Sequence, residues 1–116
     1  MTHEIESVSV VEKVKCPIVE AIKTIGGQWN MVVVRYLSER PMGFNEILRE
    51  SGSMNSKTLS RVLKILQQRG LIKREIISTQ PFQVRYSLTE KGEALKPVMD
   101  SLGDWGKRWV IDKSMQ

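Results

Sequence analysis

The spacing of apolar residues in the first half of the chain is that of amphipathic helices. One helix is predicted to begin at Pro17, because the fixed φ of proline suits an opening helical turn, and to end at Gly26 and Gly27. A second is predicted over residues 28–38, and a short third one runs from Phe44 to Glu50. In the second helix the apolar side chains recur at i, i+3, i+4, i+7 and i+8, which is core spacing: Trp29, Val32, Val33, Tyr36 and Leu37.

A fourth helix is predicted between Asn55, a favourable N-cap, and Arg69, with Gly70 closing it. Its two faces are cleanly separated. The apolar face consists of Leu59, Val62, Leu63 and Leu66, and the polar face of Lys57, Ser60, Arg61, Lys64 and Gln68.

The pattern then changes to that of strands. Residues 71–77 and 82–88 are rich in β-branched and alternating apolar residues, and residues 78–81 supply a polar turn, so the segment predicts a β-hairpin. A last helix is predicted from Thr89, with a break near Lys96 caused by Pro97. Its apolar positions are Leu95, Val98, Met99, Leu102, Trp105 and Trp109. The order of elements predicts a mainly α protein with a small β-hairpin (α+β).

Length and composition limit the classes of protein that remain. A chain of 116 residues is one domain, which we place at residues 16–112, between an N-terminal arm (1–15) and a tail (113–116). The apolar runs are too short for a membrane span and the first residues are acidic rather than basic, so a cytoplasmic, nucleoid-associated protein is expected. One histidine and one cysteine give little basis for a metal site or a catalytic nucleophile. No enzyme activity, metal or cofactor is expected.

The positive charge is concentrated in the middle of the chain. Residues 57–91 contain eight basic and two acidic residues, whereas the whole chain has 18 basic and 13 acidic ones. This concentration favours a face that meets a polyanion. The alternative is an ordinary solvated helix face.

Two short helices, the second with a basic outer face, followed by a hairpin are typical of a winged helix-turn-helix. In such a fold a helix enters the major groove of DNA and the hairpin contacts the adjacent backbone or minor groove. The residues expected to read bases are Ser56, Lys57, Thr58, Ser60 and Arg61, the last with the geometry to bind guanine through two hydrogen bonds. Those expected to contact phosphates or to lie in the wing are Lys64, Lys73, Arg74, Ser78, Thr79, Gln80 and Arg85.

The terminal helices predict a dimer. Two tryptophans on one stripe are a large apolar load for a small monomer, so the interface is expected to include Ile18, Leu102, Trp105 and Trp109. An aromatic cage for a planar effector is the alternative interpretation of the tryptophans, and the sequence names no effector.

Several strings resemble the HxlR-type transcriptional regulators. They are Cys16-Pro17-Ile18, Gly26-Gly27-Gln28-Trp29, Phe44-Asn45-Glu46-Ile47, the segment from Lys57 to Leu63, Arg69-Gly70-Leu71-Ile72, and the segment from Val84 to Gly92. The resemblance implies a bacterial or archaeal homodimeric winged-helix regulator whose dimer interface uses the N-terminal and C-terminal helices. A symmetric dimer is expected to bind a pseudo-palindromic operator with half-sites about one helical turn apart. The expected action is repression by covering a promoter, and activation is the alternative. The chain departs from the family at Gln28 and Gly43, where basic residues are common, and this removes positive charge near the first helices.

Cys16 has two interpretations. The resemblance implies a sensor of oxidants or quinones, and the adjacent helix N-terminus with Lys13 and Lys15 would favour the reactive thiolate. The alternative is a small apolar residue packed in the dimer interface. For the whole chain, the alternative to a DNA-binding regulator is a winged helix that binds another protein without specific DNA binding.

Overall fold

The computed structural model describes residues 15–112, so the arm predicted for residues 1–15 and the tail of 113–116 lie almost wholly outside it. The helices are α2 (Pro17–Ile25), α3 (Gln28–Glu39), α4 (Phe44–Ser51), α5 (Ser56–Gln68), α6 (Glu90–Glu93) and α7 (Lys96–Gly106). The strands are β1 (Ile72–Thr79) and β2 (Phe82–Leu88), and a π-helical turn, η1 (Lys107–Ile111), extends α7. The predicted mainly α fold with one hairpin is confirmed. Within the described part of the chain, no helix is both long and apolar enough to cross a bilayer.

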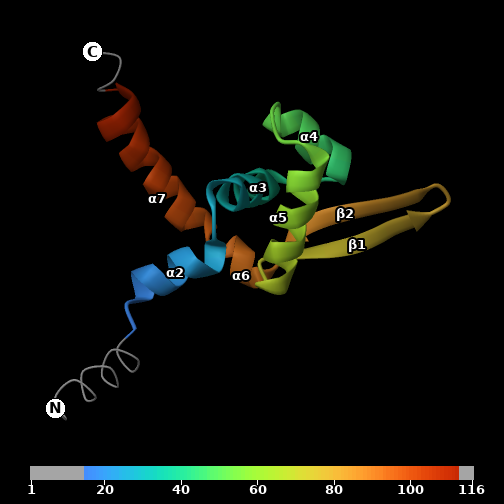
Figure 1. Cartoon of the computed structure of the whole chain (residues 1–116), viewed down its shortest axis with the longest axis horizontal. Helices are drawn as coiled ribbons and strands as arrows, with labels where there is room; N and C mark the ends of the chain where they lie inside the picture. The colour runs from blue at the N-terminus through green and yellow to red at the C-terminus, as the bar shows by residue number, and fades with distance from the viewer. Residues whose placement is uncertain (1–14, 113–116) are drawn as a thin grey trace, which may run out of the picture.

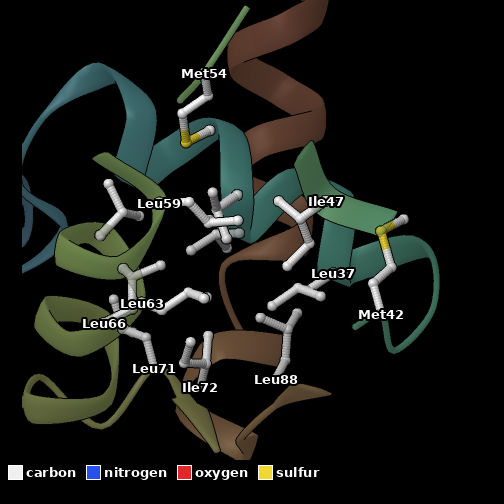
Figure 2. Close-up of a cluster of buried hydrophobic side chains, with 13 residues drawn as sticks. Leu37, Met42, Ile47, Met54, Leu59, Leu63, Leu66, Leu71, Ile72 and Leu88 are labelled. Atoms are coloured by element: carbon white, nitrogen blue, oxygen red, sulfur yellow. The ribbon is translucent and has the colours of Figure 1, made fainter. Parts of the chain in front are cut away.

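The core lies where α3, α4, α5 and the base of the hairpin meet (Figure 2). Leu59 and Leu66 of α5 are fully buried against Val33 and Ile47 of α3 and α4. The base of the hairpin completes this core. Ile72, the first residue of β1, is paired with Leu88, the last residue of β2, and both are buried. The apolar face of α5 is thus held by the core, and its other face is left to solvent.

The hairpin projects from this core on the side opposite the terminal helices (Figure 1). Its antiparallel register joins Ile72 to Leu88 and Thr79 to Phe82, with an irregularity between Ile76 and Ser78. The predicted turn over residues 78–81 is therefore too long, because this bulge lets β1 continue to Thr79 and leaves Gln80 and Pro81 as the turn.

The short segment before α4 pairs with β2 near the base of the hairpin. Met42 exchanges two backbone hydrogen bonds with Tyr86, at 3.0 and 2.7 Å between N and O. The sequence pattern predicts only a turn here, because a single bridge of this kind has no periodicity of its own.

The break predicted near Pro97 is confirmed, because α6 ends at Glu93 and α7 begins at Lys96. The helix widens into η1 after Gly106, a change of helical pitch that the apolar pattern does not predict. Trp105 lies before this change and Trp109 within η1, and both side chains are exposed.

Candidate nucleic-acid interface

The exposed face of α5 is polar and basic and carries no carboxylate. Lys57, Ser60, Arg61, Lys64 and Gln68 are exposed, while Leu59, Val62, Leu63 and Leu66 are buried on the opposite face. Lys57, Arg61 and Lys64 are spaced by four and three residues, so their side chains follow one row along the helix. The ion pairs among residues 15–112 are Lys23–Glu20 and Arg40–Glu46, so none of these three cations is neutralised by a salt bridge. Such a face suits a duplex groove with its flanking phosphates.

The N-terminus of α5 is fixed by its cap. The Asn55 side chain accepts a hydrogen bond from the backbone N–H of Thr58 at 2.8 Å. Ser56 and Lys57 are exposed in this first turn, whereas Thr58 is half-buried. Of the five residues predicted to read bases, Thr58 is therefore the least accessible.

The basic residues predicted for the hairpin lie on two different faces. Arg74 is paired with Tyr86, and Lys73 and Glu75 are paired with Ser87 and Arg85. Because side chains alternate along a strand, Arg74 points to one face and Lys73 and Arg85 to the other. Arg85 also has the carboxylate of Glu75 directly across the ladder, which reduces the charge it offers to a phosphate. Ser78, Thr79 and Gln80 are brought together at the tip of the hairpin.

Glu46 fixes the start of α4, which lies beside β2. Its carboxylate accepts a hydrogen bond from the backbone N–H of Gly43 at 2.9 Å and pairs with the Arg40 guanidinium at 2.7 Å. The Gly43 hydrogen bond and the Arg40 contact hold the pKa of Glu46 below its usual range. Glu46 thus caps the first helix of the helix-turn-helix, which agrees with a structural role for this residue in the sequence motif.

Two cations counted in the basic stretch have structural partners. Arg69, the residue after α5, donates to the carbonyl oxygens of Lys23 and Thr24 at 2.5 and 3.0 Å. Lys91 donates to the carbonyl oxygen of Arg69 at 2.8 Å. The Arg69 bonds join the end of α2 to the end of α5, and the Lys91 bond joins α6 to the same point. Charge counting missed this role because the partners of Arg69 are 45 and 46 residues away in sequence and are backbone atoms.

The predicted dimer residues lie in two exposed apolar groups on the terminal helices. In α2 these are Ile18, Val19 and Ile22. In α7 and η1 they are Val98, Leu102, Trp105, Trp109, Val110 and Ile111, with Trp105 57% exposed and Trp109 47% exposed. Val98, Ser101, Leu102 and Trp105 line a shallow hollow on α7. The guanidinium of Arg108 lies 5.2 Å from the ring centre of Trp109.

Cys16 is an exposed free thiol at the N-cap of α2. Its carbonyl oxygen accepts the first helical hydrogen bond, from the backbone N–H of Glu20 at 3.0 Å. Residues 15–112 contain no group of three or more histidine, cysteine or acidic side chains placed to hold a metal ion.

Known proteins share both this sequence and this fold. A model of the HxlR-like helix-turn-helix family matches residues 24–114. An HTH-type transcriptional regulator of Halalkalibacterium halodurans is 42% identical over 86 residues, which cover 73% of this chain and 76% of the relative. Reduced YodB of Bacillus subtilis, a transcriptional regulator, superposes with a TM-score of 0.73 at 32% identity, over 84% of this chain and 96% of YodB.

A second solved structure, the redox regulator HypR in its reduced form, gives a TM-score of 0.76 at 30% identity, over 84% of this chain and 99% of HypR. HypR has also been solved oxidised, and YodB has been solved treated with diamide and bound to quinone. The element order, the hairpin beside α5 and the family match agree with one another. The chain therefore belongs to the HxlR-like helix-turn-helix family of transcriptional regulators.

Proposed function

We propose that this protein is a homodimeric, sequence-specific double-stranded DNA-binding repressor. The observation that carries the proposal is the exposed face of α5, which is polar, basic and free of carboxylates. In this proposal Ser56, Lys57, Thr58, Ser60 and Arg61 face the bases, and Lys64, Lys73, Arg74 and Arg85 face phosphates. The regulator represses by covering the promoter that contains its operator.

The exposed apolar groups of α2 and α7 support the dimer. They lie on the side of the molecule opposite the hairpin, so a partner seated there leaves α5 and the wing accessible (Figure 1). A two-fold dimer reads two equivalent half-sites, and recognition helices in such dimers lie about one helical turn apart, roughly 10 bp. The proposed operator is therefore a pseudo-palindrome with that spacing.

The test compares two cations on the same face of α5. Arg61→Ala is expected to cost about 1–3 kcal/mol of binding free energy on the operator and to relax the sequence preference, because a base contact is lost. Lys64→Ala is expected to weaken binding to the operator and to random duplex about equally. It is also expected to reduce the slope of log K against the logarithm of salt concentration by about one. Binding is measured by fluorescence anisotropy at several salt concentrations, with an operator selected from a randomised duplex pool.

Two outcomes would contradict the proposal. If the wild-type protein binds no duplex more tightly than random DNA, its DNA binding is only electrostatic. The alternative of a winged helix that binds another protein is then favoured. If Arg61→Ala and Lys64→Ala leave selected binding unchanged, α5 is not the reading element.

We also propose that Cys16 makes the regulator responsive to oxidants. The thiol is exposed at the start of α2, and YodB and HypR, which share the fold, are described in reduced and in diamide-treated or oxidised forms. The chain has one cysteine, so a disulfide must join two chains. Two Cys16 thiols, one from each subunit, would give two protons and two electrons to the oxidant as the S–S bond forms.

Diamide is expected to convert the wild-type chain to a covalent species of twice its 13.3 kDa mass, and dithiothreitol to reverse the change. Cys16→Ser is expected to stay at the mass of one chain under the same treatment. Non-reducing electrophoresis measures both, and operator titration before and after oxidation measures the effect on DNA binding. A Cys16 thiol that neither cross-links nor reacts with iodoacetamide faster than free cysteine would support inert packing instead.

A further inference from the structure

The outer half of the hairpin exposes large apolar side chains. Phe82 is 62% exposed, Ile76 54% and Ile77 44%. Phe82 is the first residue of β2 and lies directly across the ladder from Thr79, next to the turn. It is not among the partly buried side chains that pack on the core, so the fold does not need its ring.

Charge divides the hairpin into two parts along its length. Residues 76–84 contain no charged side chain, whereas Lys73, Arg74 and Arg85 lie nearer the core. At about 3.3 Å per residue, Arg85 lies roughly 10 Å from Phe82 along β2. The hairpin is therefore basic near its base and uncharged toward its tip, where exposed apolar side chains lie beside a polar turn.

This arrangement matches the layout of a DNA groove. Phosphates line the edges of the minor groove, which is about 6 Å wide and 7.5 Å deep, and stacked bases form its floor. If the cations of the hairpin contact the phosphates at the edges of the groove, its exposed apolar side chains reach toward the bases on the groove floor. Aromatic and aliphatic side chains that reach this floor wedge between base pairs and partly unstack them.

Other occupants fit the tip less well. The apolar groups suited to a second copy of the chain lie on α2 and α7, on the opposite side of the molecule (Figure 1). A protein partner for the tip would have to tolerate the neighbouring basic residues, and a duplex has the complementary charge.

We propose that Phe82 is a DNA-contacting wedge that inserts its ring at a base step of the minor groove flanking each half-site. This inference rests on the proposed DNA-binding function and adds a residue and a mode of recognition to it. The preferred step is pyrimidine–purine, TA or CA/TG, because these steps unstack most easily. Phe82 thereby contributes sequence preference through the deformability of the DNA and not through hydrogen bonds to base edges.

The experiment uses the full-length protein and a selected operator duplex with 2-aminopurine at the flanking step. Wild-type protein is expected to raise 2-aminopurine fluorescence, because an unstacked base is less quenched. Phe82→Ala is expected to abolish this rise and to weaken operator binding about 5- to 150-fold, the range for loss of one aromatic–base stack. The salt dependence is expected to stay unchanged, since no phosphate contact is lost.

Two variants serve as matched controls. Ile76→Ala removes a comparably exposed apolar side chain from the same face, farther from the tip, and is expected to change affinity less than threefold. Phe82→Leu keeps an apolar wedge and is expected to retain part of both signals. Thermal unfolding of Phe82→Ala is expected to match the wild type, because the ring lies outside the core.

The possible outcomes separate this inference from the function on which it rests. If Phe82→Ala binds and unstacks the operator like the wild type while Arg61→Ala loses selective binding, the wedge is wrong and the DNA-binding function stands. If wild-type binding produces no fluorescence rise at any flanking step, the wedge is also wrong, whatever the affinity of Phe82→Ala. If the wild type selects no duplex, the proposed function itself fails and this inference fails with it.

Discussion

Trp105→Glu is expected to convert the proposed dimer to monomers and to weaken binding to its selected operator by roughly 10²- to 10⁴-fold. Trp105 is 57% exposed beside Leu102 and Val98, so a partner subunit that covers α7 must bury it. A carboxylate at this position would have to be desolvated in the interface without a partner. A monomer binds one half-site at a time and loses the effective concentration that the second half-site provides, which accounts for the large factor.

Sedimentation velocity at micromolar concentration measures the association, and anisotropy titration measures operator affinity. Lys96→Glu is the matched control, because residue 96 is nine positions from 105 and lies on the opposite side of α7. This variant also adds a glutamate to the helix and is expected to stay dimeric. A Trp105→Glu protein that sediments as a dimer would show that α7 is not the interface.

Gly92→Ala is expected to lower the free energy of unfolding by about 3 kcal/mol, the upper part of the range for an overpacked buried site. Gly92 is buried in α6, and a Cβ there would collide with the backbone carbonyl oxygen of Leu71 and press on the Leu88 side chain. The Leu71 carbonyl cannot move freely, because it accepts a hydrogen bond from the Thr89 N–H at 3.0 Å. For a domain of this size the loss corresponds to a fall in Tm of roughly 12–20 °C.

Calorimetry or urea unfolding at one fixed protein concentration measures this loss, since the stability of a dimer depends on concentration. Gly103→Ala is the control, because a Cβ at Gly103 has no heavy atom within 4 Å and the residue lies within α7. It is expected to be neutral or to stabilise by up to about 1 kcal/mol through helix propensity. Equal melting of Gly92→Ala and the wild type would mean that α6 can move away from Leu71 without cost.

Much of the fold could be predicted because local pattern and tertiary structure agree. The four-residue apolar face of α5 is the one that the core buries, and Asn55 caps the helix at the expected place. The exposed face of α5 follows from the same periodicity, so the helical repeat by itself places Lys57, Arg61 and Lys64 on one row.

The errors concern features that depend on distant partners or on geometry without a local pattern. The bulge beside Ile77 lengthens β1, and η1 widens the helix after Gly106, and neither has a residue type that requires it. Charge counting groups Arg69 with the DNA-facing cations, but its guanidinium binds α2. The alternating pattern makes Phe82 one apolar position of a strand, and only its place beside the turn indicates a different role.

The Arg69 bonds also have a mechanical consequence for the proposed dimer. They connect α2, which carries the exposed Ile18 and Ile22, to the C-terminal end of α5. The same end of α2 is also tied to α3, because the buried Asn30 side chain donates to the carbonyl oxygen of Ile25 at 2.9 Å. Because α5 is held in one core with α3 and α4, a displacement of α2 would act on these three helices as a unit. In the proposed dimer, the last turn of α2 would therefore set the angle between the interface and each recognition helix.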